Sequence, residues 1–137
     1  MATDPILERL TRGKLRLLVE GDGGQLRLAS DRPGLGPLRD AVFAHPGLLD
    51  GADVAMPAVG VAAALLLIHA KAGRVHARVL SHDARKALDA EGIEHQAEQV
   101  QKKLPEEHLA ELEPLEGRAR EALTPLAFVE ELRRQAE

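Results

Sequence analysis

A run of fifteen apolar residues, Val54 to Ile68, lies near the middle of the sequence. A helix that crosses a membrane needs about 20 such residues, and this shorter run is interrupted by Pro57 and Gly60. Proline is common at the first position of a helix, where its missing N–H would have no partner. We therefore expect Pro57 to begin a helix that runs from Ala58 to Lys71, buried inside a small domain.

The segments on either side of this run predict strands and further helices. Residues 14–20 and 25–30 alternate apolar and polar side chains around a glycine-rich turn, which is typical of a β-hairpin. Alternation returns at 74–80, and Ser81 is a good N-cap for a helix over 82–90. The remaining expected elements are helices at 5–12, 37–45, 105–112 and 124–135, a short extended link at 52–56, and a strand at 93–97.

Strands that alternate with helices predict a layered α/β domain. We expect a three-layer sandwich, a mixed sheet with helices on both faces, with the hairpin of 14–30 and the strand 74–80 at its centre. A chain of 137 residues fits a single domain, here with a core from 14 to 133 and a helix or tail at 1–12. The buried helix should be inaccessible along Ala62, Leu65, Leu66 and Ile68.

Composition removes several classes of function. The net charge of −4 argues against a nucleic-acid-binding module, which needs a concentrated basic face. Without cysteine the chain has no disulfide, no thiolate nucleophile and no cysteine-ligated zinc. Residues 1–10 contain acids and lack the apolar stretch of a signal peptide. We therefore expect a cytoplasmic protein with no nucleic acid or membrane partner.

The stretch Gly51 to Leu66, with the sequence GADVAMPAVGVAAALL, resembles part of a known family. It is similar to an uncharacterised prokaryotic family of unknown function with the cytidine deaminase-like fold, which carries an A-D-K-V-V-G-K-A-A-A stretch. Ser81 matches that family's helix-capping serine, Gly92-Ile93 its turn into the next strand, and Glu113-Pro114-Leu115-Glu116 its C-P-M-E motif. The resemblance spans residues 14–133 and implies the cytidine deaminase-like fold.

The departures from that family concern its polar residues. The Asp-Lys pair of the family falls on Met56 and Pro57, its second Lys on Val61, and its Cys on Glu113. A zinc deaminase needs two cysteines and a further His or Cys as ligands, with a glutamate that transfers protons. This chain has no cysteine, and Ala58 and its neighbours stand where the glutamate belongs. Deaminase chemistry is therefore excluded, and we expect no cofactor.

Histidine and serine offer few other catalytic centres. The six histidines lack the H-x-x-x-H spacing of a metal site. His76 and His82 could approach one another near Asp83, but exposed or capping histidines are the simpler interpretation, and we expect no metal. Neither Ser30 nor Ser81 lies in a G-x-S-x-G motif. We therefore assign no catalytic residue.

A pocket for an anion is predicted where two helices begin, at Pro57 and Ser81. Free N–H groups at the start of a helix bind anions, and His82 would add positive charge below about pH 6.5. The alternative is an unoccupied apolar cleft. The expected ligand-binding residues are Pro57, Ala58, Ser81, His82 and Glu116.

These observations favour a non-catalytic binding domain. Its partners would be a small anionic ligand, a protein partner, or a second copy of the chain in a homodimer. The alternative is an enzyme of unassigned reaction that uses Ser81, His82 and Glu116.

Overall fold

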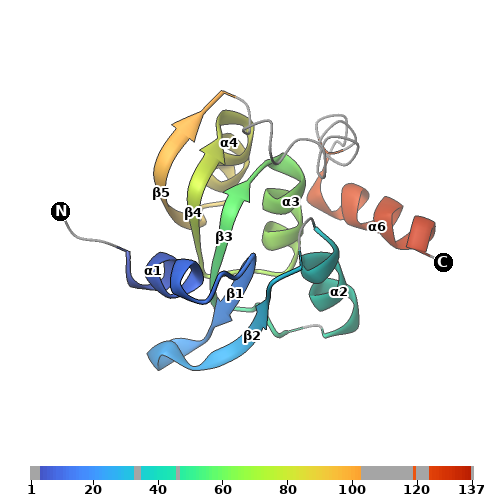
Figure 1. The fold of residues 1–137 in the computed structure, drawn as a ribbon. Coiled ribbons are helices and arrows are strands. Elements are labelled where there is room, and N and C mark those ends of the chain that lie inside the picture. The colour runs from blue at the N-terminus through green and yellow to red at the C-terminus, as the bar shows by residue number, and fades with distance from the viewer. Residues whose placement is uncertain (1–3, 33–34, 46, 103–118, 120–123, 137) are drawn as a thin grey trace.

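A five-stranded mixed sheet forms the centre of the molecule, with the strand order β2-β1-β3-β4-β5 (Figure 1). The computed structural model describes residues 4–32, 35–45, 47–102, 119 and 124–136. The strands are β1 (Leu17–Glu20), β2 (Leu26–Ser30), β3 (Asp53–Val59), β4 (Arg74–Ser81) and β5 (Glu94–Gln101). The described helices are α1 (Pro5–Arg12), η1 (Asp22–Gly24), α2 (Gly36–Ala44), α3 (Val61–His69), α4 (His82–Ala90) and α6 (Pro125–Ala136).

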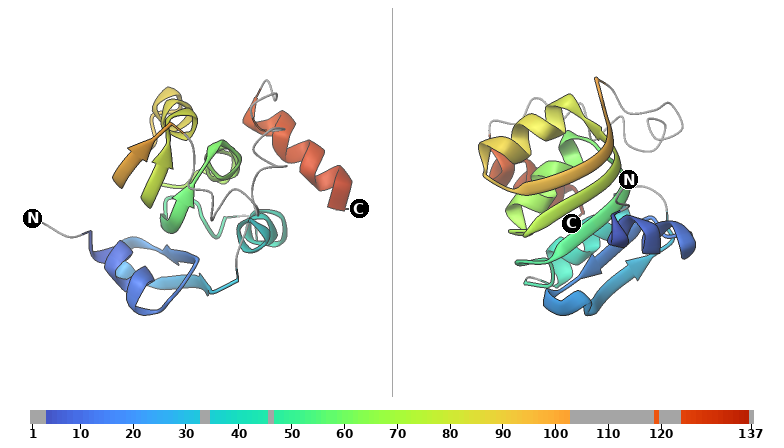
Figure 2. Two further views of the ribbon diagram at one scale, coloured as in Figure 1. Left: turned by 45° about the horizontal axis from the view of Figure 1, so that its top comes forward. Right: turned by 90° about the vertical axis from the view of Figure 1, so that its left-hand side faces the viewer.

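Strand direction divides the sheet into two parts. β1 is antiparallel to both β2 and β3, whereas β3, β4 and β5 are parallel to one another. Helix α1 packs on β1, β3 and β4 from one side, and α3, with α2, α4 and α6 around it, covers the other side (Figure 2). The predicted α/β class is confirmed, and the arrangement is consistent with a three-layer sandwich.

The prediction for Pro57 and Ala58 is wrong, because both residues lie in the strand β3. The helix α3 begins at Val61, and Gly60 is its N-cap. β3 also occupies the centre of the sheet, between β1 and β4, where we expected the hairpin and the strand 74–80. A strand that is buried on both faces has a continuous apolar sequence, so spacing alone does not distinguish it from a buried helix.

Pro57 fits in this central strand because the neighbouring ladder is short. The pairing of β1 with β3 ends at Leu18 and Ala55, so the missing N–H of Pro57 removes no hydrogen bond on that side. On the other side the parallel register with β4 continues through Met56 and Ala58. β1 and β3 therefore diverge at Pro57.

The other predicted elements are largely confirmed. The structure contains the predicted hairpin and the helix over 82–90 with its Ser81 cap. The strand predicted at 93–97 is also present as β5, and it extends to Gln101. The first strand begins at Leu17 instead of residue 14, because Lys14 belongs to the turn that ends α1. The expected helix at 105–112 lies outside the described residues.

Two hydrophobic clusters lie on opposite sides of the sheet. The larger one is centred on α3, where Ala62, Leu65 and Leu66 are buried as predicted while Ile68 is only partly buried. It also contains Phe128, Val129 and Leu132 of α6, whereas Leu126 of the same helix is 53% exposed. The smaller cluster contains Ile6, Leu7, Leu10, Leu18 and Ala55, and holds α1 against the sheet.

Candidate functional site

Polar contacts supplement the small apolar cluster under α1. Asp4 caps the helix by accepting from the Ile6 N–H at 3.3 Å, and its other oxygen lies 2.5 Å from Nδ1 of His76. The Nε2 of His76 lies 3.0 Å from Asp53, so both nitrogens of this buried ring have a carboxylate partner. Both contacts are hydrogen bonds only when each ring nitrogen carries a proton. His76 thereby ties the start of α1 to β3 and β4.

A second contact ties the middle of α1 to β1. Arg9 donates from Nε and Nη2 to the two carboxylate oxygens of Glu20, at 2.7 and 2.5 Å. Glu20 is only 6% exposed. The hydrogen bonds to Glu20 raise the pKa of the Arg9 guanidinium above its ordinary value. This bidentate pair fixes the helix in direction as well as position.

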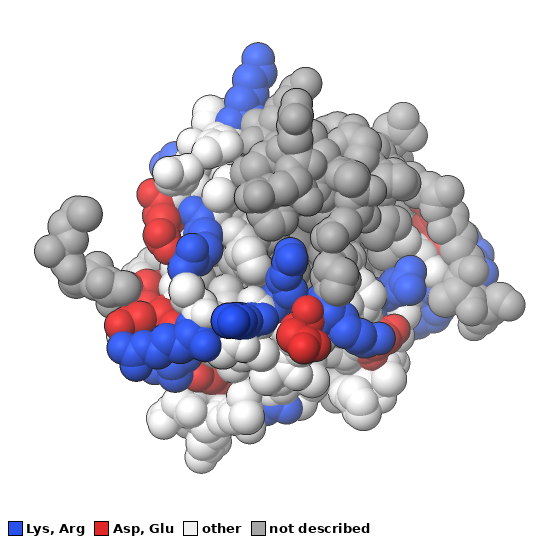
Figure 3. All heavy atoms as spheres, viewed as in Figure 1, with Lys and Arg blue, Asp and Glu red and all other residues white. Residues whose placement is uncertain are grey.

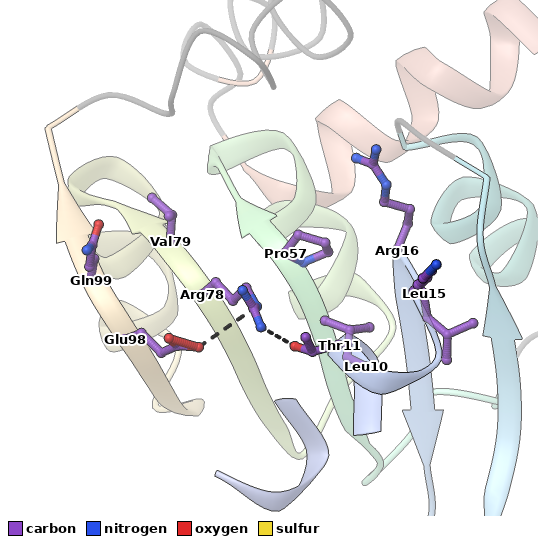
Figure 4. A pocket seen from close by; sticks show the side chains of 10 residues that line it. Leu10, Thr11, Leu15, Arg16, Pro57, Arg78, Val79, Glu98 and Gln99 are labelled. Atoms are coloured by element: carbon purple, nitrogen blue, oxygen red, sulfur yellow. Dashed lines mark hydrogen bonds and ion pairs between the residues drawn. The ribbon is translucent and has the colours of Figure 1, made fainter. Parts of the chain in front are cut away.

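A cavity of about 620 Å³ opens at the end of α1, where β1 and β3 diverge. Figure 4 shows Pro57 at its back, with Arg16 extending from the chain just before β1 and Arg78 lying between Glu98 and Thr11. Arg78 donates to the hydroxyl of Thr11 and lies 3.9 Å from the Glu98 carboxylate. The described lining residues are Leu10, Thr11, Lys14, Leu15, Arg16, Pro57, Arg78, Val79, Glu98 and Gln99.

The cavity carries more positive than negative charge. Three lining residues are cationic, and the single acidic one, Glu98, is already next to Arg78. Lys14 and Arg16 have no ion-pair partner within the described part of the chain, although basic and acidic side chains are mixed over this side of the molecule (Figure 3). These two cations are therefore available to a ligand.

A larger hollow of about 920 Å³ on the other side of α1 has a different charge balance. It shares Thr11, Arg78, Glu98 and Gln99 with the first cavity. Its remaining charges are paired within the protein: Glu8 with Arg12 at 2.9 Å, and Asp4 with His76. It offers no unpaired cation among the described residues, so we place the candidate site in the smaller cavity.

The backbone of Lys14 is unusual. Its φ of 53° lies in the left-handed region, which costs an L-residue roughly 1–2 kcal/mol. Lys14 and Leu15 donate their N–H groups to the carbonyls of Thr11 and Leu10, which is the Schellman arrangement that ends a helix. Glycine usually occupies this position. A lysine here places its side chain at the cavity despite the backbone cost.

The structure does not bring the predicted site residues together in this cavity. Pro57 lines it, but as part of a strand and not as a helix start. Ala58 is buried in the large cluster on the other side of the sheet. Ser81 is buried and accepts from the Ala84 N–H at 3.1 Å, His82 is exposed at the start of α4, and Glu116 lies outside the described residues.

Lys14, Arg16 and Arg78 were not identified from the sequence. Arg78 belongs to the strand in which Arg74, His76 and Arg78 alternate with apolar residues, so its position on a polar face was predictable. Lys14 and Arg16 were assigned to the hairpin, and nothing in their spacing indicated that Pro57 would leave a gap beside them. The partners of His76 were also missed, since they are Asp4 and Asp53 and not a group around His82.

The described residues form neither a metal site nor a membrane-spanning helix. No group of three or more histidine and acidic side chains is placed there to hold a metal ion. No helix in that part of the chain is both long and apolar enough to span a membrane.

Comparisons with known proteins agree with the fold described above. The model of a family described as TM1506, domain of unknown function (DUF1893), matches residues 6–105. The crystal structure of a DUF1893 family protein (TM1506) from Thermotoga maritima is similar with a TM-score of 0.81 and 23% sequence identity. That similarity covers 96% of this chain and 87% of the other, and at this identity it shows the fold alone. No curated protein matches the chain.

Proposed function

This chain belongs to the DUF1893 family, and we propose that it binds a small anionic ligand, without catalysis, in the cavity beside α1. The observation that carries the proposal is the pair of cations, Lys14 and Arg16, that line the cavity without a partner among the described residues. Arg9, Arg12, Arg74 and Arg78, on the same side of the sheet, each have a carboxylate partner. A phosphate, sulfate or carboxylate group would supply the missing partner, and a guanidinium suits all three.

The described lining lacks the groups that catalysis would require. Its hydroxyl, on Thr11, donates to the Leu7 carbonyl at 2.9 Å and accepts from Arg78, so it is not an activated nucleophile. Its carboxylate, Glu98, is next to Arg78, and no histidine lines the cavity in that part of the chain. The apolar side chains of Leu10, Leu15 and Pro57 would contact the rest of the ligand.

The alternative enzyme has no comparable support. Ser81 is buried, and its hydroxyl oxygen accepts a hydrogen bond from the Ala84 N–H, as in a helix N-cap. His82 is exposed. The cytidine deaminase-like relationship remains an inference from the sequence motifs, and the lack of cysteine separates such a relationship from zinc-dependent deamination.

Thermal unfolding with sulfate tests the proposal, because a ligand that binds only the folded state raises the melting temperature. We expect a larger rise with sodium sulfate than with sodium chloride at equal ionic strength. The excess should be smaller in Arg16→Gln and in Lys14→Gln than in the unmodified chain, while the general stabilisation that sulfate gives to folded proteins stays in every variant. Arg134→Gln and Lys86→Gln, exposed on α6 and α4, are the matched controls and should keep the full excess. No excess, or an equal excess in Arg16→Gln, would contradict the proposal.

The pH dependence of sulfate binding distinguishes this cavity from the site first expected at His82. Sulfate keeps its charge between pH 6 and pH 8, and arginine and lysine as residue types titrate far above this range. Histidine titrates at about pH 6.5. Binding in the α1 cavity should therefore be similar at both pH values. A loss at pH 8 that His82→Ala abolishes would assign the anion to His82 instead.

A further inference from the structure

The two edges of the sheet differ in how well they are protected against another strand. β2 has five residues, and its ladder with β1 contains a register shift between Val19 and Glu20. It also carries Arg27, which donates to the carbonyls of Leu48 and Asp50 at 3.0 and 3.2 Å. Positive charge and irregular pairing are the usual means of blocking an exposed edge.

β5 lacks these features. Its eight residues contain no Lys, Arg or Pro, and its register with β4 runs from Glu94 to Gln101 without a shift. No described residue pairs with its outer edge, where β5 is the last strand of the sheet. Val100, near its end, is 38% exposed. The edge is thus long, regular and open within the described part of the chain.

The acidic side chains of β5 do not strongly repel a second strand, because arginines of β4 partly neutralise their charge. Glu94 accepts from Arg74 at 3.0 and 2.8 Å, and Glu98 lies 3.9 Å from Arg78. These contacts also place Glu94 and Glu98 on the side of the sheet that α1 occupies, since Arg78 contacts Thr11. His95, 2.8 Å from Asp89 of α4, lies on the other side.

We propose that β5 pairs with β5 of a second copy of this chain, antiparallel and centred on Ala97. A twofold axis perpendicular to the sheet places the α1 side of both copies on the same side of the joined sheet. The even-numbered side chains of one β5 therefore lie opposite even-numbered side chains of the other. Centring on Ala97 places Gln96 opposite Glu98 of the second copy, where an amide can donate to a carboxylate. It also places Glu94 opposite Val100, and no like charges meet.

The neighbouring registers are less favourable. Centring on Glu98 places the two copies of Glu98 directly opposite one another, and centring on Gln96 places Glu94 opposite Glu98 twice. Like charges at opposed positions of a sheet are destabilising. Of these three registers, charge favours the one centred on Ala97, and a second copy is the occupant whose sequence supplies this complementarity.

The absence of cysteine makes the proposed register directly measurable. The variants Ala97→Cys, Glu98→Cys and Gln99→Cys each carry one thiol, and mild oxidation followed by a non-reducing gel detects disulfide-linked dimers. Only the thiol of Ala97→Cys meets its own copy in the proposed register. The thiol of Glu98→Cys is offset from its copy by two residues, about 7 Å along the strand, which is too far for a disulfide.

The expected result is rapid cross-linking at 97 and slow cross-linking at 98, 99 and the exposed control site in Lys86→Cys. Sedimentation velocity of the unmodified chain should show a concentration-dependent dimer. Gln96→Glu should weaken that dimer by placing two glutamates opposite one another, without changing the melting temperature of the monomer. Cross-linking that is greatest at 98 or 99, or no faster at 97 than at 86, would overturn the proposal. Glu98 and Gln99 of β5 also line the anion cavity, so the anion-binding assay relies on variants of Lys14 and Arg16, which lie outside β5, and either proposal can fail without the other.

Discussion

The two sides of the sheet hold their helices by different means. Around α3 the contacts are almost entirely apolar, from the small alanines of the helix to Phe128 of α6. Under α1 a cluster of five buried residues is supplemented by the Asp4–His76–Asp53 and Arg9–Glu20 contacts. The α3 side therefore depends on burial, whereas the α1 side depends on burial and on charge.

This difference explains why the candidate site lies on the α1 side. Apolar packing leaves few polar groups, and a helix surrounded by close-packed side chains leaves no room for a ligand. A helix of eight residues covers only part of the sheet. The uncovered part beyond its end, beside Pro57, is the candidate cavity.

The largest effect is expected from a charge placed in the apolar layer. Leu66 is fully buried in α3, so Leu66→Asp leaves an unpaired carboxylate there, at a cost on the order of 5 kcal/mol. We expect loss of the cooperative thermal transition in circular dichroism. An unchanged melting temperature would show that α3 is not at the centre of the domain.

A smaller loss is expected when the polar contacts of α1 are broken. His76→Leu removes the partner of Asp4 and Asp53 and should lower the free energy of unfolding by about 2–4 kcal/mol in urea denaturation. His95→Leu is the matched control, because His95 contacts the exposed Asp89 in a surface pair worth at most about 1 kcal/mol. Equal losses in the two variants would mean that His76 does not hold α1 in place.

The smallest effect is expected at the ends of α1 and α3, which share one backbone geometry. Lys14 and Lys71 both have positive φ, 53° and 63°. Glycine relieves the strain but adds freedom to the unfolded chain, so Lys14→Gly and Lys71→Gly should each stabilise by about 0.5 kcal/mol. Only Lys14→Gly should also reduce the response to sulfate. If both variants respond to sulfate like the unmodified chain, Lys14 is not part of the site.

The sequence predicted the elements whose signals are local. Gly92 at positive φ, the Ser81 cap and the alternation of 74–80 are each read from a few neighbouring residues. β3 could not be recognised in this way, because it is buried on both faces and contains a proline that is tolerated because it lies past the last β1–β3 pair, Leu18–Ala55. The candidate site depends on that long-range detail, so among the described residues of the first proposal only Pro57 lines it.

The gap at Pro57 also divides the molecule dynamically. β1 is joined to β3 through three residue pairs, from Leu18–Ala55 to Glu20–Asp53, whereas the β3–β4 register spans Asp53 to Val59. Proteins open locally in cooperative units, which separate where contacts are fewest. We expect the hairpin of β1 and β2 to form one such unit, whose amide protons should exchange with solvent sooner than those of β3 and β4. Because the cavity lies on the boundary, a bound anion would bridge the two units and slow that exchange.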